Sequence, residues 1–360
     1  MSETTSTTGT APAPMADSTK PLASEPKGRT GAARILAGRD AITIYALIAF
    51  LIYAAIAIPR FASPVTTGFL LLDVIPVLLI AMPMTLIIIT GEIDLSVASI
   101  AGLTSALMGV LWAGGMDIWL VLAISLLAGL AAGMFNGFLI AVLGLPSLAV
   151  TIGTLALFRG LALVIIGDNA VANFPKALTA FFTSKLGGTG IPTVMIGVVV
   201  VIVFFGVLLH FTPFGRGLFA IGYSKEAASF VGIKVARSKF WLYVASGVVS
   251  ALAGIYWTLR YTSARSDNAS GLELAVIAAV LLGGVSIFGG KGSIPGVIAG
   301  VLLIGTLNYA LRLARVSDVV LITVTGLLLI VSVVAPSVGS AIKQWRHTRR
   351  VRRSFTRSTP

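Results

Sequence analysis

Two carboxylates, Glu92 and Asp94, stand close together between two long apolar stretches, in Gly91-Glu92-Ile93-Asp94-Leu95-Ser96. Charged groups at membrane depth are costly, so each of them needs either a partner or a function. Asp94 or Ser96 can cap the helix that is expected to begin at about Val97. The same break in the chain could instead lie beside a cavity, as broken helices do in transporters. The two roles are compatible, and we favour capping as the main one.

Arg159 lies near the middle of another apolar stretch. A guanidinium there is costly unless it is paired or reaches water or headgroups. Its partner is expected to be a carboxylate, Asp94 first and Glu92 second, or else the carbonyl groups of a helix. A structural ion pair that fixes helix packing is favoured over direct contact with a substrate.

Asn136 and Asn308 are single amides within apolar stretches, and Thr151, Thr154 and Asn169 add polarity to the apolar stretch that contains Arg159. Amides and hydroxyls both donate and accept hydrogen bonds, which would suit an uncharged polyol. Hydrogen bonding between helices explains the same residues equally well. The candidates for a translocation path or for intramembrane polar contacts are therefore Glu92, Asp94, Arg159, Asn136 and Asn308.

The nearest approach to a phosphate-binding loop is the glycine-rich stretch 288–293. The motif G-x-x-x-x-G-K-[ST] requires glycine at its first position and Ser or Thr after the Lys. This chain has Val285 and Gly292 at those positions. With no cysteine and only two histidines, it also lacks the residues for a metal cluster or a His-based catalytic site. We predict a protein with no catalytic or metal-binding residues and no cofactor of its own.

The composition is that of a membrane protein. Hydrophobic residues make up 57% of the 360 residues and charged residues 11%, whereas soluble domains carry about 25% charged residues. We predict an all-α polytopic membrane protein with about ten transmembrane helices. The apolar stretches lie near 41–59, 69–89, 97–112, 117–143, 147–166, 193–211, 240–260, 272–288, 294–311 and 318–336, with the third, eighth and ninth on the short side.

The basic residues predict the orientation of these spans. If both termini are inside, 18 of the 26 Lys and Arg residues fall in inner segments, 7 in outer segments, and Arg159 within a span. This bias favours an N-in, C-in arrangement. We expect a disordered cytoplasmic tail at 1–40, a transmembrane domain at 41–336, and a basic cytoplasmic tail at 337–360.

Glycines recur at four-residue spacing in the fourth and ninth stretches. Small residues one helical turn apart allow helices to approach closely. Because five spans separate the two runs, they would cross the membrane in opposite directions, as in an inverted repeat of spans 2–5 and 7–10. The abundance of glycine, with 39 in the chain, is the alternative explanation. The residues are Gly129, Gly133 and Gly137, and Gly292, Gly296 and Gly300.

The inner segment 212–239 is basic and polar between two apolar stretches. Within it, Ser224 can cap a short helix, Glu226 would occupy the first turn, where the helix dipole favours an acid, and Gly232 would end the helix. We therefore expect a short cytoplasmic helix on which a partner can dock. A plain basic loop is the alternative.

Several motifs resemble those of the permease subunits of ABC sugar importers. Glu226-Ala227-Ala228-x-x-x-Gly232 is similar to their coupling loop, and residues 91–97 resemble the "GGIDLSVG" signature of the ribose, xylose and arabinose type. Glu92 replaces the usual second glycine and Ala98 a common one, which favours the rhamnose or autoinducer-2 branch. The resemblance covers about residues 70–335. Further matching blocks are Asn136-Gly137, Leu145-Pro146-Ser147, Thr151-Ile152-Gly153-Thr154, Arg159-Gly160, 278–286 and Gly289-Gly290-Lys291-Gly292.

The resemblance implies a bacterial inner-membrane permease that imports a monosaccharide or similar small polyol delivered by a periplasmic binding protein. Two permeases, identical or paralogous, would form the pore. Two cytoplasmic ATPases, which bind ATP and Mg, would seat on the helix at 223–232. The residues that would couple the ATPase to the pore are Ser224, Glu226, Ala227, Ala228 and Gly232.

A proton-coupled secondary transporter is the alternative function. It would use Asp94, Glu92 and Arg159 as a charge relay, but it does not explain the short polar helix at 223–232. A membrane scaffold without transport activity explains neither feature.

Overall fold

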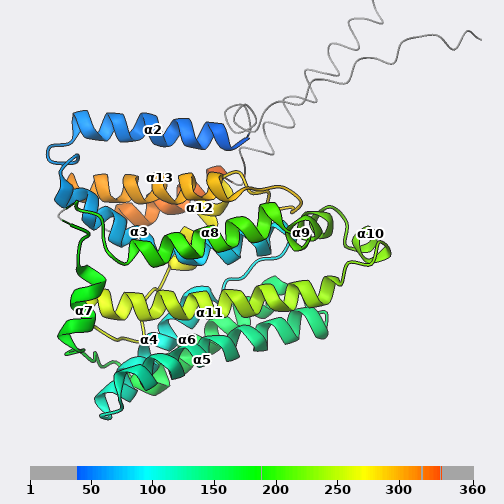
Figure 1. Ribbon diagram of the computed structural model, residues 1–360, viewed down its shortest axis with the longest axis horizontal. Helices are drawn as coiled ribbons and strands as arrows, with labels where there is room; N and C mark the ends of the chain where they lie inside the picture. The colour runs from blue at the N-terminus through cyan, green and yellow to red at the C-terminus, as the bar shows by residue number, and fades with distance from the viewer. Residues whose placement is uncertain (1–38, 188, 318, 333, 335–360) are drawn as a thin grey trace, which may run out of the picture.

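The computed structural model describes residues 39–187, 189–317, 319–332 and 334. The predicted tails, except residues 39 and 40, lie outside this part of the chain. The described residues are predominantly helical, and the extended pairs among them are two isolated bridges, Val171 with Ala264 and Lys185 with Pro192. The prediction of an all-α polytopic fold is confirmed (Figure 1).

The helices follow the apolar stretches of the sequence closely. In chain order they are α2 (Arg39–Ala57), α3 (Pro64–Ile89), α4 (Val97–Ala113), α5 (Ile118–Gly137), the π-helical turn η1 (Phe138–Val142), α6 (Ser147–Ile166), α7 (Lys176–Thr183), α8 (Met195–Phe211), α9 (Pro213–Tyr223), α10 (Lys225–Phe230), α11 (Val235–Tyr261), α12 (Leu272–Leu282) and α13 (Ile294–Leu313). A further apolar helix covers Val319–Ser332.

Fewer of these helices than expected are long enough to cross a membrane. Among the described residues six qualify, or seven if α8 and α9, which meet at a bend of 68°, count as one span. The predicted third and eighth spans are the short helices α4 and α12, as expected. The ninth, α13, has 20 residues, so the expectation that it is short was wrong. Helix α12 ends at Leu282 because Gly283 and Gly284 follow, the latter at a φ of +90°.

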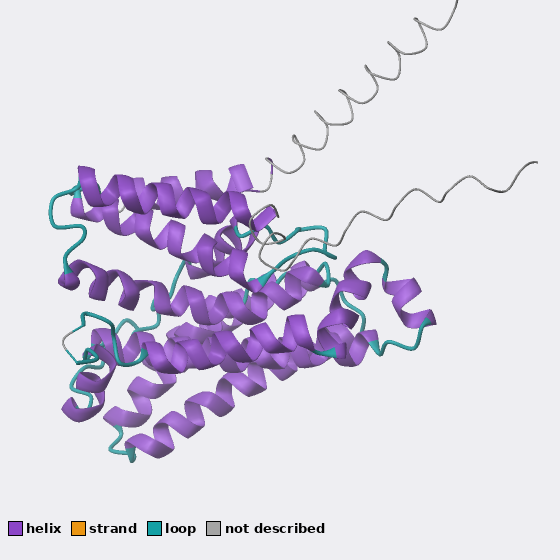
Figure 2. Ribbon diagram, turned by 45° about the horizontal axis from the view of Figure 1, so that its top comes forward, coloured by secondary structure: helices purple, strands orange, loops and turns teal. Residues whose placement is uncertain are grey.

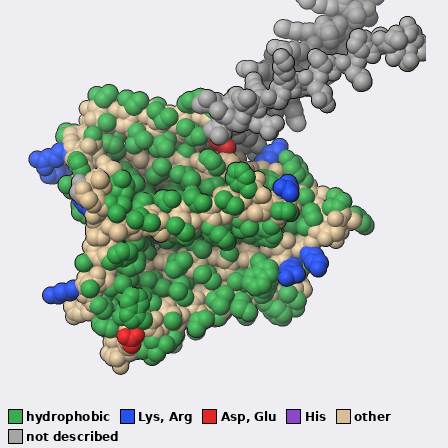
Figure 3. Space-filling view, in the orientation of Figure 1, with side chains coloured by type: hydrophobic (Ala, Val, Ile, Leu, Met, Phe, Trp, Pro, Cys, Tyr) green, Lys and Arg blue, Asp and Glu red, His purple; other side chains and the backbone are tan. Residues whose placement is uncertain are grey.

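Helix α3 forms the centre of the bundle. It is buried along most of its length and packs against α8, α11, α12 and α13. Helices α4, α5 and α6 lie on the far side of α11, and α2 lies at the opposite edge against α13 (Figures 1 and 2). Apolar side chains cover most of the face seen in Figure 3, and Lys and Arg side chains gather at its two ends. This distribution suits a protein whose flanks face lipid.

The first glycine run lies where α5 crosses α11. A Cβ at Gly133 would stand 2.5 Å from the carbonyl oxygen of Tyr243, and one at Gly129 would stand 2.7 Å from that of Gly247. A Cβ at Gly137 would stand 3.0 Å from the carbonyl oxygen of Phe240. These three glycines therefore let two long helices pack backbone to backbone.

The second glycine run makes different contacts. Gly296 and Gly300 pack against the end of α12 at Gly283, and Gly292 packs against the side chains of Ile89 and Val285. The two runs are therefore not equivalent in packing. The helices nevertheless exchange partners between the two halves of the chain. In the first half, α4 and α5 pack on α11; their counterparts in the second half, α12 and α13, pack on α3. This exchange of partners agrees with the predicted repeat of spans 2–5 and 7–10.

One end of the bundle gathers the segments that the charge bias assigns to the cytoplasm. The backbone N–H of Gly290 donates to the carbonyl of Ile89 at the end of α3, over 2.8 Å. Asp40, at the start of α2, accepts a hydrogen bond from Ser293. Helices α9 and α10 project from the same end (Figure 1). We refer to it as the cytoplasmic end.

Candidate functional site

The short helix α10 has the capping geometry that its sequence predicts. The hydroxyl of Ser224 accepts the N–H of Ala227 at 3.1 Å and donates to the carboxylate of Glu226 at 2.9 Å. Hydrogen bonds from the backbone N–H of Glu226 and from Ser224 lower the pKa of the Glu226 carboxyl, which stays charged at the positive end of the helix. Gly232, at a φ of +85°, lets the chain turn away after the helix.

The α10 segment, defined as residues 223–232, presents apolar side chains to the surroundings. Phe230 is 91% exposed, Val231 75% and Tyr223 69%. Ala228 is the buried member of α10 and attaches the helix to the bundle. The segment projects from one end of the bundle, beyond the long apolar helices (Figure 1). Apolar groups that project from a charged end are typical of a surface that binds a protein partner.

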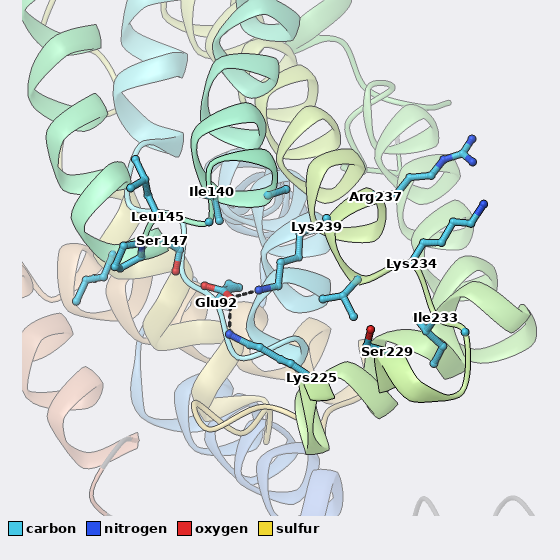
Figure 4. A pocket seen from close by; sticks show the side chains of 17 residues that line it. Glu92, Ile140, Leu145, Ser147, Lys225, Ser229, Ile233, Lys234, Arg237 and Lys239 are labelled. Carbon is cyan, nitrogen blue, oxygen red and sulfur yellow. Dashed lines mark hydrogen bonds and ion pairs between the residues drawn. The ribbon is translucent and has the colours of Figure 1, made fainter. Parts of the chain in front are cut away.

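Glu92 lies at the junction of α10, α11 and the loop 90–96. Its Oε1 atom forms ion pairs with Nζ of Lys225 at 2.8 Å and with Nζ of Lys239 at 2.5 Å (Figure 4). The Glu92 side chain is 9% exposed and that of Lys239 is 11% exposed, whereas Lys225 is 47% exposed. Burial raises the pKa of Glu92, but the hydrogen bonds from Lys225, Lys239 and Ser147 outweigh burial, so that its pKa lies below the ordinary value.

Asp94 is fully buried and has a different set of partners. Its Oδ2 accepts the hydroxyl of Ser246 on α11 at 2.8 Å, and its Oδ1 accepts both the N–H and the hydroxyl of Ser96. Ser96 stands at the N-cap of α4 but its own side chain makes no capping bond, since it is turned to Asp94. The prediction that Asp94 or Ser96 caps α4 was therefore wrong: Asp94 binds the N–H of the cap residue Ser96, and neither side chain binds an N–H inside the helix.

Arg159 bonds to backbone carbonyls instead of to the carboxylates that were expected first. Its Nη1 donates to the carbonyls of Ser266 at 2.6 Å and Asn268 at 2.9 Å, and its Nη2 to that of Ala98 at 3.3 Å. The expected pair with Asp94 or Glu92 was therefore wrong. The alternative of carbonyl partners was right, although two of the three carbonyls belong to the loop 262–271 rather than to a helix.

The predicted amides occupy separate places. Asn136 on α5 donates to the hydroxyl of Ser96 at 2.8 Å, so it joins the cluster around Asp94. Asn308 lies on α13, and its Oδ1 has no hydrogen-bond partner among the described residues. Asn169 lies beyond the end of α6 and not within the span, contrary to expectation.

Four residues of this region were not singled out in the sequence. Lys225 and Lys239 bind Glu92, while Ser246 and Tyr243 bind Asp94 and the carbonyl of Ile93 respectively. The two lysines could have been proposed as partners of Glu92 from the sequence, because a buried acid needs a cation and both lysines lie in the basic segment 212–239. Nothing in the sequence marks Ser246 or Tyr243, because serine and tyrosine are common in membrane helices and neither residue carries a charge that requires a partner.

A groove opens beside Glu92 at the cytoplasmic end, with a volume of about 1090 Å³. The connection between α10 and α11 forms one wall, and the connection between η1 and α6 forms the other. Lys225 and Lys239 point toward Glu92 across the groove, whereas Lys234 and Arg237 point away from it (Figure 4).

Residues 66–333 match the model of a protein family described as "Branched-chain amino acid transport system / permease component". The chain belongs to this family of transport permeases. It is 36% identical to the autoinducer 2 import system permease protein LsrD of Salmonella paratyphi B over 318 residues, which cover 85% of this chain and 95% of that protein.

Two further relatives bear the same printed name. The protein of Klebsiella pneumoniae is 36% identical over 279 residues, covering 76% of this chain and 83% of the relative. That of Photorhabdus luminescens is 36% identical over 290 residues, covering 77% and 86%. No solved structure matches the chain significantly.

The family fixes the class of protein. The chain is the permease subunit of an ABC importer and a multi-pass protein of the inner membrane. It is a transporter subunit rather than a catalytic enzyme, and importers of this kind work with an ATPase and a periplasmic binding protein. The geometry also disfavours the alternative of a proton relay, because the described residues Glu92, Asp94 and Arg159 each bond to other partners and form no hydrogen bond or ion pair with one another.

Proposed function

We propose that this permease imports autoinducer-2 or a closely similar small polyol sugar. The relatives described above are autoinducer-2 import permeases that align with most of the chain at 36% identity. The polar groups within the bundle, such as Asn136, Thr151 and Asn308, are amides and hydroxyls, which can bind an uncharged polyol. A binding protein would deliver the sugar to the outer end.

The energy source is a separate ATPase, which binds ATP and Mg and docks on the α10 segment. The observation that carries this proposal is the exposure of Phe230, Val231 and Tyr223 on a well-capped helix at the cytoplasmic end. Glu226 and Ala227 are exposed beside them, while Ser224 and Gly232 fix the two ends of the helix. Two permease chains, identical or paralogous, would assemble with two ATPases around one pore.

Uptake in proteoliposomes tests the transport function. The permease, its ATPase and its binding protein are reconstituted together, with labelled autoinducer-2, rhamnose and ribose as separate substrates. We expect uptake of autoinducer-2 that requires ATP inside the vesicles on the ATPase side. Uptake driven by a proton gradient without ATP would refute the proposal, and ATP-driven uptake of rhamnose alone would refute its choice of substrate.

Binding of the ATPase to variants of the α10 segment tests the docking surface. Phe230→Ser removes a side chain that contributes little to the isolated permease, because it is 91% exposed. Truncating a central apolar contact of an interface typically costs more than about 1 kcal/mol, so we expect the Kd for the ATPase to rise about fivefold or more. Glu226→Lys should abolish stimulation of ATP hydrolysis while the permease remains folded.

Phe288→Ser is the matched control for Phe230→Ser. Phe288 is 81% exposed and lies in the loop 283–293, outside the α10 segment. Its replacement should leave the Kd unchanged. An unchanged Kd for Phe230→Ser, or normal stimulated hydrolysis in Glu226→Lys, would show that the ATPase docks elsewhere. Equal weakening by both Phe variants would show that the docking surface is not confined to the α10 segment.

A further inference from the structure

Two contacts join the α9–α10 region to the loop 90–96. Lys225, the first residue of α10, forms an ion pair with Glu92 in the loop. Near the end of α9, Gly222 lies so close to the carbonyl oxygen of Ile89 that a Cβ would overlap it. Because Ile89 directly precedes the loop, the α9–α10 region touches the loop 90–96 both at its start and at Glu92. A displacement of α10 would therefore move the loop at both points.

Glu92 stands between an exposed element and the buried bundle. The same oxygen that binds Lys225 also binds Lys239, which belongs to the second turn of α11 and is 11% exposed. The carboxylate is 9% exposed and shared by two cations, so its loss would leave the ammonium of Lys239, which is 11% exposed, without a compensating charge. Glu92 is thus the point at which α10, α11 and the loop meet.

The loop carries this contact into the polar interior of the bundle. One residue after Glu92, the carbonyl of Ile93 accepts the hydroxyl of Tyr243 on α11 at 3.2 Å. Asp94 then binds Ser246, also on α11. A shift of Glu92 therefore changes the geometry of the hydrogen bonds that join the loop 90–96 to α11.

We propose that Glu92 is a positioning residue of the transport cycle, which transmits the displacement of α10 to the loop 90–96 and so to the interior of the bundle. Through Lys225 it receives the movement, and through the loop it passes the movement to Asp94. This inference rests on the proposed docking of an ATPase on the α10 segment. It adds that one ion pair, and not only the docking helix itself, determines how efficiently hydrolysis drives import.

The number of sugar molecules imported per ATP hydrolysed tests the proposal. Glu92→Gln keeps the size and the acceptor oxygen but removes the charge, and Lys225→Gln removes the charge of the partner. Couplings between sites typically amount to about 5- to 150-fold, so we expect each variant to reduce this ratio by about fivefold or more. Glu92→Gln should keep the affinity of the wild type for the ATPase, which separates its failure from a failure of docking.

A double-mutant cycle identifies the pair. If Glu92 acts through Lys225, the number of sugar molecules imported per ATP should fall little further in the double variant than in either single variant. Lys234→Gln is the matched control, since Lys234 lies in the same groove and points away from Glu92 (Figure 4); its ratio should equal that of the wild type. The proposal is overturned if the two losses simply add, or if melting temperature and yield fall while the ratio is unchanged. If Glu92→Gln folds poorly, Lys225→Gln still tests the proposal, because Lys225 is 47% exposed and its replacement disturbs the fold less.

Discussion

Gly102 on α4 leaves the space that the guanidinium of Arg159 occupies. A Cβ built on Gly102 would overlap Nη1 of Arg159 and would stand 3.0 Å from the carbonyl oxygen of Asn268, one of the acceptors of that same nitrogen. The small residue on α4 and the charged residue on α6 therefore form one unit. This unit ties the loop 262–271, from the second half of the chain, to two helices of the first half.

Gly102→Ala should destabilise the permease. The new methyl group has to displace Arg159 or the loop backbone, and overpacking of this kind typically costs about 1–3 kcal/mol. Thermal unfolding of the purified protein in detergent measures the effect. Gly160→Ala is the control, because a Cβ at Gly160 would meet nothing within 4 Å, and it should leave the melting temperature unchanged or raise it. Equal effects of the two substitutions would contradict the packing described here.

Arg159→Ala should lower the amount of folded protein. It leaves the carbonyls of Ser266 and Asn268 without a donor, and each unsatisfied buried acceptor costs about 1–3 kcal/mol. Arg159→Lys should rescue the yield only in part, since a single ammonium group cannot reproduce the fork of the guanidinium. The yield of monodisperse protein and its melting temperature are the measurements, and wild-type values for Arg159→Ala would refute the structural role.

The pair can be tested together. In the Arg159→Ala background, Gly102→Ala should cost much less than it does alone, because the clash partner is gone. Additive losses would show that the two residues act independently.

Gly133→Ala and Gly153→Ala form a matched pair of opposite sign. A methyl group at Gly133 would approach the carbonyl oxygen of Tyr243 to 2.5 Å and separate α5 from α11. At Gly153, on α6, it meets nothing within 4 Å, and alanine favours the helix by about 0.5–1 kcal/mol over glycine. We expect the melting temperature to fall in the first variant and to rise or stay level in the second. A fall of similar size in both would contradict the α5–α11 contact.

The helices could be predicted from the sequence because their apolar stretches are long and their ends carry local signals. Ser224, Glu226 and Gly232 marked α10 correctly, since capping acts over three or four residues. The partners of the buried charges could not be predicted in the same way. Glu92 finds its lysines 133 and 147 residues further along the chain, and Arg159 finds carbonyls 107 and 109 residues away.

Arg159 shows why the first expectation for it was wrong. Every residue has a backbone carbonyl, so no sequence pattern reveals which of them will face a buried cation. Asp94 was the partner expected first, yet its carboxylate oxygens accept hydrogen bonds from the hydroxyls of Ser96 and Ser246. The family signature indicated the function but not these contacts, because a signature records residue types rather than the packing that joins distant segments.

Acid should selectively remove the stabilising contribution of Glu92. Because its pKa in the folded protein lies below the ordinary value of 4.5, Glu92 stabilises the fold fully above that value and loses this contribution as the pH falls through its lowered pKa. The wild type should therefore melt at a higher temperature than Glu92→Gln at neutral pH. The difference between them should shrink as the pH falls below 4.5. Melting temperatures of both proteins, measured in the same detergent from about pH 7 to about pH 3, follow this difference. A difference that stays constant over the whole range would mean that the charge on Glu92 does not hold Lys225 and Lys239 in place.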